Sequence, residues 1–291
     1  MKFPATALFL CTLSLNAQET VEEDRLLLPG RERRLERREA ASEEFPELSL
    51  KLQNPLARIL VIPTAMEYKK GSGPLGTGES FAIRVAPRVP FVINDEWHML
   101  SKSDLAWVSQ KDVIGNTSQE GLTDLVQTFF FSPDRSLGWD LYWGVGPSFV
   151  IPTATDSLIG SEKLSLGPSI GIFRQERPWT VGLILNHIWS VAGSSSAQSL
   201  NASRLEPIIG YTTERSTFFS LGAKLGYDWS GHHWSGPLEF RLSQLTLIAG
   251  KPVQWGLGLQ YFVFSEPNAP EWGALFQVTF PIDSPRRGSE L

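Results

Sequence analysis

Three residues of the stretch HHWS, His232, His233 and Ser235, lie close together in the chain. On an extended strand, residues two apart share a face, so the imidazole of His233 could serve as general base for the hydroxyl of Ser235. Such a pair needs a third group that orients the histidine, and no asparagine is evident on the adjoining segments. Gly231 and Gly236 flank the stretch and indicate a loop tip. Hydrolysis is therefore an alternative and not the main interpretation.

Two further patterns suggest ligand binding that their surroundings do not support. The adjacent pair His232 and His233 supplies two metal ligands, whereas a dedicated site needs three or four. The stretch GSGPLG at 71–76 matches G-x-G-x-x-G, but Pro74 interrupts it and a strand rather than a helix follows. We therefore predict no metal site and no cofactor. The net charge of −5 leaves no basic surface for nucleic acid.

The start of the 291-residue chain has the features of an export signal. Lys2 is followed by an apolar run, and Leu15-Asn16-Ala17 resembles a cleavage site, which predicts a signal peptide over residues 1–17. Cys11, the only cysteine, lies inside it, so the exported chain would hold no disulfide. Residues 18–47 are dense in charge and are expected to be helical or disordered.

From about residue 61 onward, the chain alternates bulky and small or polar residues in long segments. In PWTVGLILNHIWSVAG, at 178–193, this alternation lasts about fourteen residues, whereas an ordinary strand has roughly 5–6. No long helical pattern separates the segments, so they are expected to pair in an antiparallel order. The twelve predicted strands are 61–69, 79–93, 97–108, 121–132, 138–151, 163–174, 178–192, 200–213, 216–229, 234–248, 252–265 and 271–282.

Tryptophans near the strand ends indicate what the bulky faces contact. Trp179 and Trp189 are ten residues apart, which spans about 25 Å along the normal at a rise of ~3.3 Å per residue and a tilt of ~40°. That is the height of the apolar band of a transmembrane barrel, whereas the strands of a soluble β-sandwich would be shorter. His187 falls on this face, near Trp189. The predicted membrane-interface aromatics are Trp97, Trp107, Trp139, Trp179, Trp189, Trp255 and Trp272.

The predicted connections alternate between long and short, as in outer-membrane barrels, whose extracellular loops are long and whose periplasmic turns are short. Residues 109–120, 152–162 and 229–236 are expected outside, and both termini in the periplasm. Because the turn 94–96 has three residues, odd-numbered residues pair with odd-numbered residues and even with even across this hairpin. This register places Arg88 opposite Lys102.

The faces opposite the bulky residues are small or polar, as a barrel lumen requires. Arg88 and Lys102 are opposed like charges, and Asp104 lies where it can offset their repulsion. We predict a cluster of Arg84, Arg88, Lys102 and Asp104, completed by Asp124. When the other inward-facing charges, Asp140, Arg204, Glu206 and Asp228, are included, positive and negative groups nearly balance, so weak charge selectivity is expected. The predicted lumen-lining charges are Arg84, Arg88, Lys102, Asp104, Asp124, Lys224, Glu239 and Arg241.

Four segments carry a resemblance to a known family: LQNPLARILVIP (51–63), WGVGPSFVIPTATD (143–156), WTVGLILNHIWSVAG (179–193) and PEWGALFQVTF (270–280). They resemble the outer-membrane proteins grouped with the MetA pathway of phenol degradation, often labelled transporters or mislabelled neuromedin U. The resemblance covers residues 51–282 and implies an exported outer-membrane β-barrel with a transport role, without assigning site residues. Eleven residues follow Phe280, whereas such barrels usually end on the aromatic residue that the outer-membrane assembly machinery recognises.

Together these observations predict an all-β fold, a twelve-stranded antiparallel transmembrane β-barrel over residues 48–282 with a C-terminal tail, 283–291. Asn54-Pro55 resembles a helix start, so a short helix is expected near residues 56–62, and residues 48–62 are expected to block part of the lumen.

The predicted function is passive movement of small solutes, hydrophobic or aromatic ones among them, across the outer membrane of a Gram-negative-type bacterium. The protein is expected not to be an enzyme, and its partners are lipids, solute and the assembly machinery. Two alternatives stay open. The first is a lipid hydrolase, because outer-membrane phospholipase is a twelve-stranded barrel with histidine and serine at the spacing of His233 and Ser235. The second is a structural or surface-interaction barrel without transport.

Overall fold

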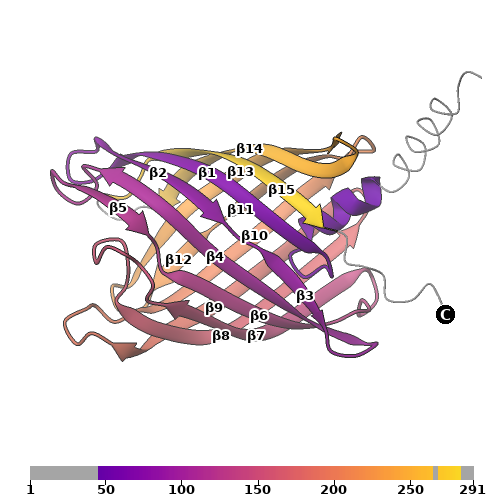
Figure 1. The fold of residues 1–291 in the computed structure, drawn as a ribbon, viewed down its shortest axis with the longest axis horizontal. Coiled ribbons are helices and arrows are strands. Elements are labelled where there is room, and N and C mark those ends of the chain that lie inside the picture. Colours follow the sequence, from indigo (N-terminus) through magenta and orange to yellow (C-terminus); the bar gives the residue numbers. More distant parts are fainter. Residues whose placement is uncertain (1–44, 265–267, 283–291) are drawn as a thin grey trace, which may run out of the picture. The chain divides into compact units, whose positions relative to one another are not determined.

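The computed structural model describes residues 45–264 and 268–282, and it shows an all-β fold with one short helix at residues 45–53 (Figure 1). The expectations for residues 1–17, for most of 18–47 and for 283–291 concern parts of the chain outside the described residues. No helix among the described residues is long and apolar enough to cross a bilayer.

The strands close into a twelve-stranded antiparallel barrel, which confirms the predicted fold. Every neighbouring pair is antiparallel, and β1 pairs with β15 from Leu60–Ile282 to Lys70–Trp272, which closes the sheet on itself. Three of the twelve strands are interrupted and therefore carry two labels each: β2 with β3, β5 with β6, and β11 with β12. The elements are β1 Leu60–Ser72, β2 Gly78–Val85, β3 Arg88–Val92, β4 Trp97–Lys111, β5 Ser118–Leu122, β6 Leu125–Pro133, β7 Leu141–Ile151, β8 Lys163–Glu176, β9 Trp179–Gly193, β10 Asn201–Thr212, β11 Thr217–Ala223, β12 Leu225–Asp228, β13 His233–Ile248, β14 Lys251–Phe264 and β15 Trp272–Ile282.

The exterior of the barrel is apolar along most of its strands. On β9, Trp179, Val181 and Leu185 are exposed, while Thr180 and Ile184 between them are buried. Rings also pack edge-on across neighbouring strands, as Trp179 does against Tyr211 with centroids 5.1 Å apart. An exterior of this kind is stable only against lipid, because exposed apolar bands of this size are not found on soluble monomers.

The interior carries polar side chains that bond to one another across strands. Thr128 Oγ1 and Ser148 Oγ are 2.6 Å apart, and Ser148 Oγ and Ser169 Oγ are also 2.6 Å apart. The amide nitrogen of Asn186 then donates to Ser169. Small hydroxyl groups let four strands, β6 to β9, satisfy their inward polar atoms without filling the lumen.

The short helix lies before Asn54-Pro55 and not after it, so the expectation of a helix near 56–62 was wrong. Pro46 stands in the first turn of the helix, where its missing N–H is not needed. Asn54 ends the helix instead of starting one, because its side-chain oxygen accepts the amide of Leu56 at 2.9 Å in a local turn. From Leu60 the backbone pairs with β15, which excludes a helix there.

A second difference concerns Trp139, which was placed on a strand that began at residue 138. Strand β7 begins at Leu141, because Gly138, Trp139 and Asp140 all have positive φ and form a turn. Trp139 is 89% exposed in this connection. The sequence did not reveal this turn, because Trp139, Leu141 and Trp143 alternate with smaller or polar residues as they would along a strand.

The barrel ends differ as the loop pattern predicted, and cysteine labelling would test which end faces outward. Connections at the end where β1 begins include the two-residue turns 177–178 and 249–250, whereas 152–162 at the other end has eleven residues. In a chain without Cys11, we expect Asn116→Cys to react with an impermeant maleimide on intact cells and Ser136→Cys to react only after permeabilisation. Labelling of Ser136→Cys alone on intact cells would reverse the orientation.

On β9, a new charge should lower the stability of the barrel more on the face toward lipid than on the face toward the lumen. Leu185→Arg puts a guanidinium near the bilayer midplane and should lower the free energy of unfolding by about 2–4 kcal/mol. Ile188→Arg is its control, because Ile188 lines the interior cavity, where water can solvate the charge. Urea titrations in detergent or vesicles would measure both, and equal losses would contradict the face assignment.

Candidate functional site

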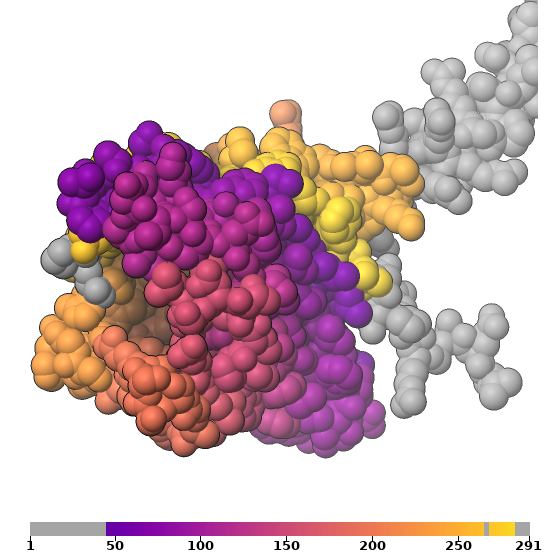
Figure 2. Space-filling model, turned by 60° about the vertical axis from the view of Figure 1, so that its left-hand side comes forward, coloured from indigo at the N-terminus to yellow at the C-terminus, as the bar shows by residue number. Residues whose placement is uncertain are grey.

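The inward faces of the strands enclose a cavity of about 630 Å³, and the space-filling view shows a hollow between the magenta and the orange strands (Figure 2). All eight charged residues that the sequence predicted as lumen-lining do line this cavity. Arg204 and Glu206 of β10 line it as well. Sequence reasoning missed Glu67 and Lys69 of β1, although the outward positions of Met66 and Tyr68 would have placed both inside by alternation.

Arg84 on β2 is the centre of one group of charges. Its Nε donates to Glu67 Oε1 at 3.1 Å, and its Nη1 is bonded to Asp104 on β4. Lys69 Nζ lies 3.6 Å from the other oxygen of Glu67. Arg84 is therefore shared between acidic residues of both neighbouring strands, as diagonal pairs in a sheet allow. The predicted contact of Arg84 with Asp104 is present.

A second group lies on the strands at the other side of β1. Glu239 on β13 accepts a hydrogen bond from Gln260 Nε2 at 2.8 Å and forms ion pairs with Lys224, at 3.4 Å, and with Arg241. Charges also interact across the lumen, Lys224 with Glu67 and Lys102 with Glu206. These contacts join β1, β2, β4, β10 and β13, together with Lys224 between β11 and β12, into a charged belt around the cavity, which we call the belt. Its members are Glu67, Lys69, Arg84, Lys102, Asp104, Arg204, Glu206, Lys224, Glu239 and Arg241.

Asp124 does not complete the predicted cluster. Its carboxylate accepts the amides of Ala154 at 3.1 Å and Ser161 at 2.7 Å, together with the Ser161 hydroxyl at 2.6 Å. Asp124 thus holds the connection 152–162 at the mouth of the barrel, where Ile159 reaches the cavity. The sequence placed Asp124 on the correct face but could not show that a loop returns to use its oxygen atoms.

The opposite end of the lumen is occupied by residues 45–59, which we call the plug. Ser49, Leu52, Asn54 and Leu56 of the plug are all buried. Leu56 packs into an apolar cluster whose other members are Leu100, Phe130, Phe173 and Ile184, contributed by β4, β6, β8 and β9. The predicted blocking segment, 48–62, overlaps the plug, although its helix lies earlier than expected.

Barrel side chains bind the carbonyl groups at the end of the plug helix. Gln175 Nε2 donates to Leu50 O at 2.6 Å, and the two terminal nitrogens of Arg88 donate to Leu52 O and Asn54 O at 3.4 Å each. Carbonyls at a helix C-terminus lack partners within the helix and carry partial negative charge, which a cation complements. Arg88 therefore faces the plug and makes no contact with Asp104.

His98 forms the clearest link between the barrel and the plug. This ring is 3% exposed, its Nε2 lies 3.1 Å from Leu56 O, and its Nδ1 lies 2.6 Å from Asp134 Oδ1. Arg58 of the plug donates to the other oxygen of Asp134 at 2.9 Å. Both ring nitrogens thus face oxygen atoms, one in the plug and one in the connection 134–140, so the ring links these two segments.

Removal of His98 should therefore loosen the plug. A hydrogen bond to a charged group contributes about 1.5–3 kcal/mol, so His98→Ala should speed amide hydrogen exchange over residues 49–57 by about ten-fold or more. His187→Ala is the matched control, because His187 lies on the exterior. Exchange measured by mass spectrometry in both variants checks this prediction, and unchanged rates in His98→Ala would show that the apolar contacts alone hold the plug.

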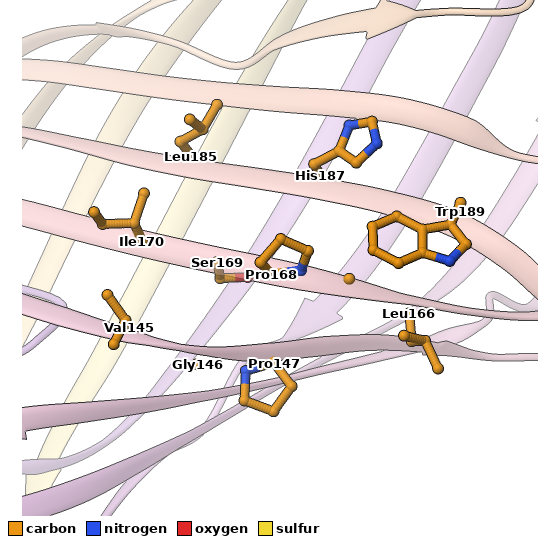
Figure 3. Close-up of a pocket in the computed structure, with 11 residues that line it drawn as sticks. Val145, Gly146, Pro147, Leu166, Pro168, Ser169, Ile170, Leu185, His187 and Trp189 are labelled. Atoms are coloured by element: carbon orange, nitrogen blue, oxygen red, sulfur yellow. The ribbon is translucent and has the colours of Figure 1, made fainter.

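The exterior carries a shallow hollow of about 560 Å³ on β7, β8 and β9 (Figure 3). Pro147 and Pro168 face each other there, and the strand pairing of β6 with β7 and of β8 with β9 is interrupted at their height. His187 borders the hollow, with its Nδ1 2.9 Å from Ser203 Oγ and its ring 5.5 Å from that of Trp189. Apart from this histidine the lining is almost wholly apolar, as a surface in lipid requires.

His233 and Ser235 lie on β13 and are not among the residues that line the cavity. Trp234 between them is exposed and packs on Tyr227 of β12, with ring centroids 5.0 Å apart. Alternation therefore turns both flanking residues away from the lipid.

Comparison with known proteins identifies the fold but no family. No family model matches the chain, and no curated protein matches it. The COG4313 outer-membrane channel from Pseudomonas putida F1 superposes with a TM-score of 0.56 and 15% identity, covering 78% of this chain and 97% of that one. The NanC porin has 14% identity and a TM-score of 0.49, and the match covers 76% of this chain and 100% of the porin. Escherichia coli outer-membrane phospholipase A has 10% identity and a TM-score of 0.45, and the match covers 75% of this chain and 92% of the phospholipase.

The fold is that of an outer-membrane β-barrel. The similarity to the COG4313 channel, at 15% identity, supports the barrel architecture but not a particular function. The porin and the phospholipase have TM-scores below 0.5, so these two similarities do not distinguish a channel from a hydrolase. The function must therefore be argued from the lumen itself.

Proposed function

We propose that this protein is a passive channel for small solutes, hydrophobic or aromatic ones among them, in the outer membrane of a Gram-negative-type bacterium. The belt is the observation that carries the proposal. Ten ionisable side chains inside a lipid-facing wall would be strongly unfavourable unless water reaches them. A hydrated, charged passage is what a channel for small solutes needs.

Both mouths of the passage are narrowed by segments that side chains of the wall hold in place. Asp124 holds the connection 152–162 at one mouth, and His98 and Arg88 hold the plug at the other. A solute would cross by diffusion, first past the loop, then along the belt, and finally past the plug when that segment shifts. No cofactor is part of this mechanism.

The motifs shared with the MetA-pathway group support the same proposal. WGVGPSFVIPTATD contributes Ser148 to the polar interior and Ala154 to the loop that Asp124 holds. WTVGLILNHIWSVAG contributes Ile184 and Asn186 to the cavity lining. The shared segments thus coincide with the parts that shape the passage, and we propose that the chain belongs with that group.

Current recordings on planar bilayers test the channel. We expect the full-length protein to give discrete conductance steps, and a variant without residues 45–56 to give larger ones, because its mouth is open. Silence of both variants would favour a structural barrel. Release of fatty acid from phospholipid vesicles, lost in Ser235→Ala, would instead favour the lipid hydrolase.

Charge selectivity should depend on the carboxylates that neutralise Arg84. Asp104→Asn removes one of its two acidic partners, so the reversal potential in a salt gradient should move toward that of the anion. Arg84→Gln should move it toward that of the cation. Glu214→Gln, in the connection 213–216, is the control and should leave the potential unchanged. Unaltered potentials in both lumen variants would place the conducting path away from Arg84.

A further inference from the structure

The lining of the cavity is divided into a charged and an apolar part, and this division bears on the substrate of the proposed channel. Charged residues come from β1 to β4, from β10 and β13, and from Asp124 and Lys224, which lie between β5 and β6 and between β11 and β12. Apolar side chains come from the plug and from the strands between β6 and β11. The apolar lining residues include Leu52, Val126, Phe130, Phe173, Ile184, Ile188, Ile208 and Phe218.

Cations outnumber carboxylates along the cavity. Seven cationic side chains line it against five carboxylates, with Arg88 and Asp124 added to the belt. Among the carboxylates, Glu67, Asp104 and Glu239 are in ion pairs with Lys69, Arg84, Lys224 or Arg241, while Asp124 binds loop amides. The lining is therefore not balanced, in contrast to the expectation from the sequence.

The imbalance is concentrated at three residues, Arg88, Lys102 and Arg204. None of them has an ion pair within 4.0 Å in the described part of the chain. Glu206 interacts with Lys102, Arg204 and Lys224, and Arg88 binds plug carbonyls at 3.4 Å. Lys102 and Arg204 thus share Glu206 with a further cation, and Arg88 has no ion-pair partner among the described residues, which leaves positive charge for an anion in the cavity.

Strand register places partly exposed apolar residues one level away from these cations. Lys102 pairs with Thr128, and Val126, two residues along the same face, pairs with Asp104. On the other wall Arg204 pairs with Asn186, and Ile188, two residues along the same face, pairs with Ala202. Two residues along a strand advance about 7 Å. The cations and the apolar residues, which we call the cationic level and the apolar level, are therefore separated along the strands by about the length of a small organic acid.

From this placement we infer that the channel selects amphipathic monoanions, molecules with one carboxylate and a compact apolar group such as an aryl ring. The inference rests on the proposed function and names its substrate class. The carboxylate meets Lys102, Arg204 and Arg88, and the apolar group lies on Val126 and Ile188, which line the cavity and are partly exposed. A small inorganic anion leaves the apolar level empty, and an organic cation is repelled by Lys102 and Arg204.

Calorimetry on the full-length protein in detergent tests the inference without requiring transport. The probes are phenylacetate, acetate, which lacks the ring, and phenylethylammonium, which replaces the carboxylate with a cation. We expect saturable binding of phenylacetate at least about ten-fold tighter than that of either other probe, after subtraction of micelle titrations. Equal binding of acetate or of phenylethylammonium would overturn the inference.

Variants assign the binding to the named cations. Lys102→Gln and Arg204→Gln should each weaken phenylacetate binding about ten-fold, and Lys102→Arg should restore it. Arg215→Gln, in the connection 213–216, is the control. Heat-dependent mobility on gels shows whether each variant is folded. Wild-type affinity in folded Lys102→Gln and Arg204→Gln would also overturn the inference.

Planar-bilayer currents, measured in parallel, separate the inference from the proposed function. Preferential phenylacetate binding with no current supports the inference and overturns the channel. Current without a preference for phenylacetate supports the channel and overturns the inference. Where both hold, phenylacetate should reduce the potassium chloride current at concentrations close to its calorimetric dissociation constant.

Discussion

Closure of the sheet between β1 and β15 is the constraint on which the rest of this molecule depends. In a bilayer, each unpaired backbone group is costly because no water can bond to it, so a spanning sheet has to have no edge. Eleven paired positions, from Leu60–Ile282 to Lys70–Trp272, satisfy this requirement. Closure also separates two environments, and the inner one can hold ionisable side chains only because the outer one is sealed.

The inner environment is organised by pairs that bridge strands distant in sequence. Arg84 joins Glu67 and Asp104, and Glu239 joins Lys224 and Arg241. These contacts hold charged groups against the wall and leave the centre of the lumen to the few cations that lack such partners. The same wall anchors the plug through His98 and Arg88, so the strength of the barrier at one mouth depends on residues that also shape the passage.

The twelve strands and their faces were predictable from sequence, because alternation and tryptophan spacing report directly on which side chains face lipid. The pairing of Arg88 with Lys102 also followed, since the turn 94–96 sets the register. The partners of the inward charges did not follow. Asp124 binds a loop and Arg88 binds the plug, because each of these contacts depends on how a distant segment returns to the lumen. Glu67 was overlooked although alternation along β1 places it inside. The helix was misplaced because Asn54-Pro55 suits a helix start and a turn equally well.

The facing prolines of β7 and β8 have a mechanical consequence. Pro147 and Pro168 cannot donate to β6 and β9, and the pairing on both sides is interrupted at their height. The other breaks, between β2 and β3, between β5 and β6 and between β11 and β12, each fall within one strand, whereas here two adjacent strands lose ladder bonds at one height. Fewer backbone hydrogen bonds therefore resist bending along this panel. Lateral pressure from the bilayer acts on this panel, which couples the width of the lumen to the tension of the surrounding lipid.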